Sequence, residues 1–222
     1  MNEEISKFEW GDGEESQIAT EARDWLPKKG DRVFVATNEG CRLDPLGFTG
    51  YGEPRNPTGR WQLYASGFLS AADRLVESYM GCAHEDEFIY PILSLYRHHL
   101  ELELKYVLRC CPAYYEDLEE WLTKEHGLCA LWRKIAELYP RFGEWTSKDC
   151  TDGCECLITE FDEHDPNSQA GRYPQDRRGN QTLGRLEIVG LKELKLGAGK
   201  VSHYLATITE QIAEDRDSET EY

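Results

Sequence analysis

The residues best suited to chemistry lie together in the segment 97–103, which reads Arg-His-His-Leu-Glu-Leu-Glu. A histidine near neutral pH can act as an acid, a base or a ligand, and a neighbouring arginine can stabilise a developing anion such as a phosphate. Two members of the segment, His99 and Glu103, stand one turn apart inside the apolar arc of the helix predicted for residues 92–107. Burying two ionisable groups without partners costs several kcal/mol, so the sequence predicts that they are partners or parts of a site.

A second cationic candidate lies in a polar loop, in the motif Gly171-Arg172-Tyr173-Pro174. Pro174 holds Tyr173 in an extended conformation, which fixes the loop next to Arg172. Because an arginine fork can donate two hydrogen bonds to one carboxylate, we expect Arg172 to be the loop partner of Glu103. The alternative is that Arg172 is simply an exposed loop residue.

His99 and Glu103 also have a purely structural interpretation. In that case they form a buried polar network that fixes the register of the helix. A metal site on this helix is not predicted. The usual helical metal signatures need two histidines at this spacing, or a Glu-x-x-His pair repeated on another helix, and neither is present.

The cysteines offer a weaker candidate for a metal site. Cys150-x-x-x-Cys154-x-Cys156 brings three thiols close in sequence, and Cys82-x-His84 or Cys110-Cys111 can be imagined as the remaining ligands. The spacing lacks the paired Cys-x-x-Cys units of zinc ribbons and fingers, so buried free thiols are the expectation and structural zinc the alternative.

Helical periodicity surrounds these candidates and predicts an all-α helical bundle with an irregular N-terminal elaboration that holds one short strand. We divide the chain into an irregular N-terminal segment (1–60), a bundle domain (61–213) and an acidic tail (214–222) that we expect to be solvated or frayed. The predicted elements are a helix at 17–25, a strand at 32–36, a Gly- and Pro-rich loop at 40–59, and helices at 61–80, 86–110, 114–122, 128–138, 155–161 and 191–212. The last helix has the spacing of a bundle helix, and Gly197 and Gly199 weaken its middle but can let another helix approach closely.

Composition restricts the class of protein. The 222 residues carry a net charge of −17, which argues against a nucleic-acid coat or a membrane-surface binder, although a local basic cleft can still bind RNA. No run of about 18 apolar residues is present, and the N-terminus lacks the layout of a signal peptide. We therefore expect a cytoplasmic protein that spans no membrane, with its eight cysteines as free thiols.

Three motifs in this order resemble a group of bacterial proteins described as similar to HEPN domains, the all-α bundles of toxin–antitoxin and antiviral defence systems. The likeness covers about residues 60–212. The motifs are Tyr96-Arg97-His98-His99-Leu100-Glu101-Leu102-Glu103-Leu104-Lys105, His126-x-Leu128-x-x-Leu131-Trp132 and Asp165-Pro166-x-Ser168-x-x-x-Arg172-Tyr173-Pro174.

This resemblance implies a helical bundle, frequent dimerisation and, in active members, a metal-independent RNase. The family's catalytic mark is an arginine followed four to six residues later by a histidine on one helix. The present sequence departs from it, because Arg97 is followed at once by His98 and His99, and no histidine stands at 102–104. The resemblance therefore supports an expectation about the fold more strongly than one about RNase activity.

If the protein is an enzyme, we expect it to cleave RNA at a subunit or helix interface. His98 or His99 would then move the proton of the attacking 2′-hydroxyl, Arg97 and Arg172 would hold the phosphate, and Glu103 would orient His99. This chemistry needs no metal or other cofactor, and we predict none. The predicted partners are RNA or a cognate protein of the same module, with the chain itself a homo-oligomer.

The alternative is a non-catalytic interaction or regulatory protein. In that case the network of His99, Glu103 and Arg172 is structural, and the acidic surface faces a partner protein. A small nucleotide-like ligand is a further alternative, for which Tyr96 and Tyr173 are the candidate aromatic wall. Solvent access separates the alternatives, since a site requires these side chains around a water-filled cleft.

Overall fold

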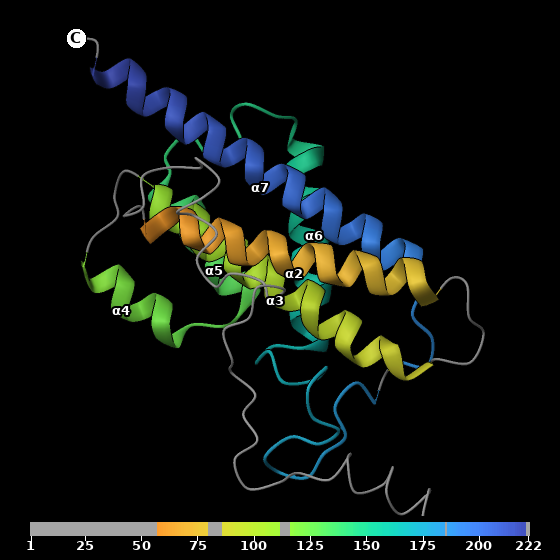
Figure 1. The fold of residues 1–222 in the computed structure, drawn as a ribbon. Helices are drawn as coiled ribbons and strands as arrows, with labels where there is room; N and C mark the ends of the chain where they lie inside the picture. The colour runs from red at the N-terminus through yellow and green to blue at the C-terminus, as the bar shows by residue number, and fades with distance from the viewer. Residues whose placement is uncertain (1–56, 80–85, 112–115, 185, 221–222) are drawn as a thin grey trace, which may run out of the picture. The chain divides into compact units, whose positions relative to one another are not determined.

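The computed structural model describes residues 57–79, 86–111, 116–184 and 186–220, all within the compact unit Leu46–Tyr222 (Figure 1). These residues form six α-helices and no β-strand, so the predicted all-α fold class is confirmed. The helix expected at 17–25, the strand at 32–36 and most of the loop at 40–59 lie outside the described residues. The helices are α2 (Pro57–Tyr79), α3 (Ile89–Cys110, preceded by the short 3-10 helix η2, Asp86–Phe88), α4 (Glu116–Lys124), α5 (Leu128–Leu138), α6 (Lys148–His164) and α7 (Leu191–Thr220).

Three helices are longer than the sequence predicts, and the first of them, α2, begins at Pro57, four residues before the expected 61. Helix α6 begins at Lys148, seven residues before the expected 155, because the Ser147 hydroxyl caps it by accepting a hydrogen bond from the Cys150 N–H at 3.3 Å. Its first half is polar and contains Gly153, so hydrophobic periodicity gives no signal there. Helix α7 continues to Thr220, so residues 214–220, expected to be frayed, are helical.

Helix α3 is the centre of the bundle and packs against α2, α5 and α7 (Figure 1). The 3-4 stripe of α7 is buried in the shared core, as expected for a bundle helix. The core includes Leu100, Leu104 and Leu108 of α3, Leu131 and Ile135 of α5, Ile158 of α6, and Val201, Leu205 and Ile208 of α7.

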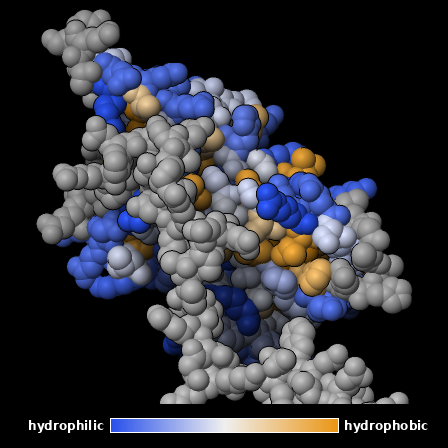
Figure 2. Space-filling view, viewed as in Figure 1, coloured by the Kyte–Doolittle hydropathy of each residue, from blue (hydrophilic) through white to orange (hydrophobic). Residues whose placement is uncertain are grey.

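On the face seen in Figure 2, the coloured surface is mostly hydrophilic, with smaller exposed apolar patches. Among the described helices, none carries an apolar run long enough to cross a membrane.

Candidate functional site

Arg97 on α3 is a buried structural clamp, with 1% of its surface exposed. Its Nε donates to the carbonyl of Asp165 at 2.9 Å, and its Nη1 donates to Glu101 Oε2 at 3.0 Å. Its Nη2 donates to the carbonyl of His126. One guanidinium therefore ties α3 to the turn that precedes α5 and to the end of α6, and it lines neither of the two large cavities described below.

Glu101 completes this network from the next turn of α3. Its Oε1 accepts hydrogen bonds from Lys105 Nζ at 2.8 Å and from His126 Nδ1 at 2.9 Å. Burial alone would raise the pKa of Glu101, but the hydrogen bonds from Lys105 and His126, with the charges of Lys105 and Arg97, hold that pKa below its usual range. Each buried charge here has partners, as a stable interior requires.

His99 is fully buried, and its two ring nitrogens have different environments. The Nδ1–H donates to the carbonyl of Ala65 on α2 at 2.9 Å, because a carbonyl can only accept. The lone pair of Nε2 therefore faces Glu103 Oε2 at 3.3 Å, although neither of these two atoms has a hydrogen bond of good geometry. Burial lowers the pKa of His99 to about 4.

Glu103 is held by α7 and not by the loop. Its Oε1 accepts a hydrogen bond from the Ser202 hydroxyl at 2.9 Å, while Arg172 donates through Nε to the carbonyl of Ser168 at 2.7 Å. The predicted pairing of Arg172 with Glu103 is therefore wrong, because the arginine instead closes its own loop. Burial raises the pKa of Glu103 to about 7, against the effect of the Ser202 hydrogen bond.

His98 faces a different side of α3 from His99 and is half-buried. Its ring packs edge-on against Phe68 with the centroids 4.4 Å apart. Burial lowers the pKa of His98, and the positive charges of Arg172 and Arg97 lower it further, while Glu101 acts in the opposite direction. The structure thus brings His98 within electrostatic reach of Arg172, which is exposed, and leaves Arg97 and His99 in the interior.

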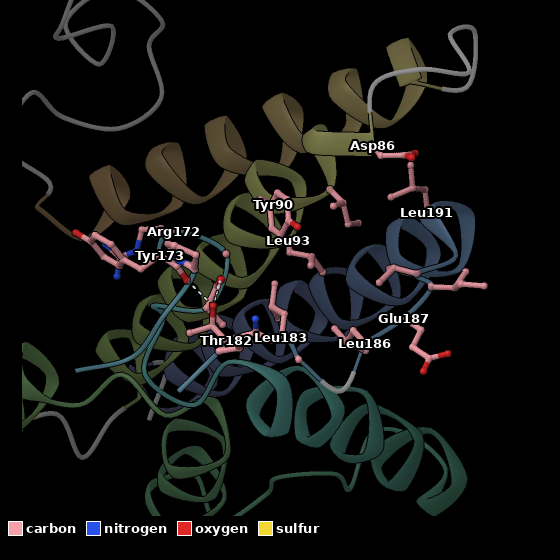
Figure 3. A pocket seen from close by; sticks show the side chains of 18 of the residues that line it. Asp86, Tyr90, Leu93, Arg172, Tyr173, Thr182, Leu183, Leu186, Glu187 and Leu191 are labelled. Atoms are coloured by element: carbon pink, nitrogen blue, oxygen red, sulfur yellow. Dashed lines mark hydrogen bonds between the residues drawn. The ribbon is translucent and has the colours of Figure 1, made fainter. Parts of the chain in front are cut away.

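An open cavity of about 880 Å³ lies beside the Arg172 loop, between the start of α3 and the segment that leads into α7 (Figure 3). Arg172 and Tyr173 lie at one end, and Asp86 and Glu187 at the other. Of the six exposed large apolar side chains in the described part of the chain, three line this cavity: Tyr90, Tyr173 and Ile188. Exposed apolar residues that gather in one place, unlike scattered ones, mark a candidate binding site.

Of the two tyrosines predicted to form an aromatic wall, only Tyr173 lines this cavity. Tyr96 has no exposed surface and donates its hydroxyl hydrogen bond to Asp73 Oδ1 at 2.7 Å. Tyr90, six residues earlier on α3, lines the cavity instead. Sequence reasoning missed it because its neighbour is a loop more than 80 residues away in the chain.

The loop that forms this cavity has a defined conformation. Asp165 Oδ1 accepts hydrogen bonds from the N–H groups of Gln169 at 2.6 Å and Ala170 at 2.9 Å. Farther on, Thr182 Oγ1 donates toward the carbonyl of Ala170 at 3.2 Å, which closes the loop on itself. Since Arg97 holds the carbonyl of Asp165, the buried clamp on α3 also positions the cavity wall.

Gly171 is the point where this loop touches α3. A Cβ at this position would lie 2.8 Å from the Tyr90 carbonyl oxygen and 2.9 Å from the Ser94 amide nitrogen, and both are backbone atoms that cannot move aside. We expect Gly171→Ala to lower the free energy of unfolding by about 1–3 kcal/mol, as overpacking does elsewhere. Urea unfolding measures this, with Gly67→Ala in α2 as the control.

A Cβ at Gly67 meets nothing within 4 Å, so the control substitution should raise stability by up to about 1 kcal/mol through helix propensity. Equal stability of the Gly171→Ala variant and the wild type would show that the loop does not dock on α3 as described.

The cysteines do not gather into a metal site in the described structure. On α6, Cys154 is buried, whereas Cys150 and Cys156 are exposed, and all six described cysteines are free thiols. Among the described residues, no group of three or more His, Cys, Asp or Glu side chains is arranged to hold a metal ion. Cys82 and His84 lie outside the described residues.

Comparison of the chain with protein-family models, with curated proteins and with solved structures finds no match. The likeness to HEPN-domain proteins stays a prediction. Function is therefore inferred from the geometry of the described residues.

Proposed function

We propose that this protein is a non-catalytic regulatory protein that binds a small ligand with an anionic group and a flat ring, of the nucleotide class, in the cavity beside Arg172. The observation that carries the proposal is the cavity itself. Its volume of about 880 Å³ lies in the range of small-molecule sites, and its wall combines apolar side chains with few polar groups.

Arg172 is the candidate anion-binding group. Its Nε and Nη2 both donate to the carbonyl of Ser168, which fixes the plane of the guanidinium. Nη1 makes no such contact, and the side chain is exposed at the end of the cavity. A guanidinium held in this way is suited to bind a phosphate or carboxylate.

Tyr90 and Tyr173 are the candidate surfaces for the ring. Each has more than half of its surface exposed, 54% and 55% respectively, although tyrosine is a large partly apolar side chain. Rings that stack on such surfaces gain both apolar burial and a favourable quadrupole contact. At the far end of the cavity, the carboxylates of Asp86 and Glu187 can accept hydrogen bonds from exocyclic amino groups.

Burial favours binding over RNA cleavage. In the RNase hypothesis Arg97 holds the phosphate with Arg172, and His98 or His99 moves the proton of the attacking 2′-hydroxyl, which requires that these side chains reach the substrate from solvent. The exposed fraction is 1% for Arg97 and 0% for His99, and the hydrogen bonds of Arg97 go to the protein itself. Of the other predicted catalytic residues, Arg172 is exposed, and His98 and Glu103 are half-buried.

The test is calorimetric titration of the full chain with ATP, GTP, cyclic AMP and adenosine. We expect a phosphate-bearing nucleotide to bind, adenosine to bind more weakly, and Arg172→Ala to reduce affinity by about 10–100-fold through loss of a charge-assisted hydrogen bond. Arg177→Ala is the matched control, because Arg177 is an exposed arginine of the same loop that does not line the cavity.

Three outcomes contradict the proposal. The first is the absence of binding by any of these nucleotides, and the second is equal affinity of the wild type and Arg172→Ala. The third is cleavage of RNA by the wild type in EDTA that is lost in folded His98→Ala and Arg172→Ala variants, which would support the RNase hypothesis instead.

A further inference from the structure

A second and larger hollow, of about 1110 Å³, runs along α7 on the side that faces α2 and α6. Its wall on α7 extends from Lys192 to Thr207, which at 1.5 Å per residue is roughly 22 Å, the length of a helix of about 15 residues. The floor is apolar. It is formed mainly by Leu69 and Val76 of α2, Leu157 of α6, Leu196 and Tyr204 of α7, and Trp145 from the turn before α6.

Two glycines in helix interiors face this groove, Gly153 on α6 and Gly199 on α7. A Cβ at either position would meet nothing within 4 Å, so no packing in the described structure requires glycine there. Gly197 differs, because its Cβ would contact Leu157 at 3.5 Å. Since glycine is the poorest helix former after proline, two unfilled glycines on one groove are consistent with a backbone that approaches closely from outside.

The unpaired charges on the α7 side of the groove are basic, although the chain as a whole carries −17. Lys195 is paired, with Nζ 2.8 Å from Glu77 Oε1 on α2. Lys192 and Lys200, three residues before and five residues after Lys195, also line the groove, and no hydrogen bond or ion pair within the described residues involves them. Three acidic residues also line the groove: Asp73 and Glu77 of α2, both of which pair with Lys195, and Asp149 in the first turn of α6, where the helix dipole stabilises a negative charge.

We propose that this groove docks an amphipathic acidic helix of a partner protein. Its apolar face lies on Leu196 and the floor, its backbone passes the two glycines, and its carboxylates face Lys192 and Lys200. This is the helix-in-groove mode of recognition, with charge complementarity that selects the partner. A second copy of the chain fits less well, because a symmetric pairing of two such faces brings the same lysines together.

The test uses two fluorescein-labelled synthetic helical peptides of about 18 residues, long enough to span the groove. Both present leucines on one face, and the flanks carry glutamate in one peptide and lysine in the other. Fluorescence anisotropy with the full chain should show micromolar binding of the acidic peptide and at least tenfold weaker binding of the basic one.

Substitutions at Gly199 separate docking from folding. Gly199→Ala should raise the melting temperature by about 2–4 °C, because alanine favours the helix, and yet weaken peptide binding. Gly199→Leu fills the groove and should abolish binding without loss of the helical circular dichroism signal. Lys192→Glu with Lys200→Glu should also remove binding, whereas Lys124→Glu on α4, outside the groove, leaves it unchanged.

Two thiols on α6 give an internal control for position. Cys150 lines the groove, and hydrogen bonds from Ser147 and then Thr146 lower its pKa, which favours its alkylation. Cys156 is exposed on the same helix and lies outside the groove. The acidic peptide should slow alkylation by iodoacetamide at Cys150 and not at Cys156, as read by mass spectrometry.

Equal binding of the two peptides, no binding, or binding that Gly199→Leu leaves intact would overturn the proposal. A concentration-dependent dimer that Gly199→Leu disrupts would overturn it in favour of a second copy. The nucleotide proposal is tested independently, because Arg172 does not line this groove. Arg172→Ala should therefore leave peptide binding unchanged.

Discussion

Replacement of Arg97 by methionine is expected to lower the free energy of unfolding by about 3–5 kcal/mol, the cost of breaking a buried ion pair by removal of one partner. Methionine retains much of the volume but none of the donors. Glu101 then loses one of the three side chains that hydrogen-bond to its carboxylate, and the carbonyls of Asp165 and His126 lose the hydrogen bonds from Arg97. Urea unfolding followed by circular dichroism gives the value.

The matched control is Lys124→Met on α4, which breaks another i,i+4 ion pair, with Glu120. Both side chains of this control pair are more than two-thirds exposed, so its loss should change stability by less than about 0.5 kcal/mol. A lysine cannot reach all three acceptors that the planar guanidinium contacts. We therefore expect Arg97→Lys to lower the free energy of unfolding by most of the amount that Arg97→Met does.

A stable Arg97→Met variant would remove the structural role assigned to this residue. It would also reopen the RNase hypothesis, in which Arg97 contacts substrate and contributes little to folding. The stability measurement therefore bears on function, because the same side chain cannot both hold two interior carbonyls and bind a phosphate in solvent.

Local patterns in the sequence predicted the elements of the bundle but not the contacts between them. Helix α5 ends at Leu138, as expected from the apolar spacing and Pro140, and α3 ends at Cys110, before Pro112. These signals are local, since periodicity and proline act within a few residues. The start of α6 at Lys148 was missed because a cap, not an apolar stripe, determines it.

The polar partners of the candidate residues are tertiary and were beyond sequence reasoning. Glu103 bonds to Ser202, 99 residues later in the chain, and Arg97 reaches a carbonyl 68 residues away. Backbone carbonyls have no sequence signature at all, because every residue carries one. The sequence could therefore indicate that His99 and Glu103 need hydrogen-bond partners. Only the fold could identify the atoms that form those hydrogen bonds.

Glu103→Gln is expected to stabilise the protein at pH 8 by about 3 kcal/mol, and the gain should disappear toward pH 4.5. In the folded protein the pKa of Glu103 is about 7, above its ordinary value of 4.5. The unfolded chain therefore releases this proton at lower pH than the folded protein, and the contribution of Glu103 to stability falls as pH rises from 4.5 to 7. Glutamine has no such proton to lose.

His99 acts in the opposite direction, since its pKa of about 4 lies below its ordinary value of 6.5. The unfolded chain binds a proton at His99 below pH 6.5, whereas the folded protein binds it only below about pH 4. The contribution of His99 to stability therefore rises with pH between 4 and 6.5. In the wild type the two slopes cancel between pH 4.5 and 6.5, and the stability contributed by the pair is flat there. In Glu103→Gln only the rise due to His99 remains.

The geometry explains why glutamine is a good replacement. Its Oε1 can still accept from the Ser202 hydroxyl, and its amide N–H can donate to the lone pair of His99 Nε2, as a protonated Glu103 would. Urea unfolding at intervals from pH 4 to 8 measures the effect, with Glu120→Gln on the exposed face of α4 as the control. A Glu103→Gln variant that is less stable than the wild type at pH 8 would show instead that His99 is protonated and that the two residues form a buried ion pair.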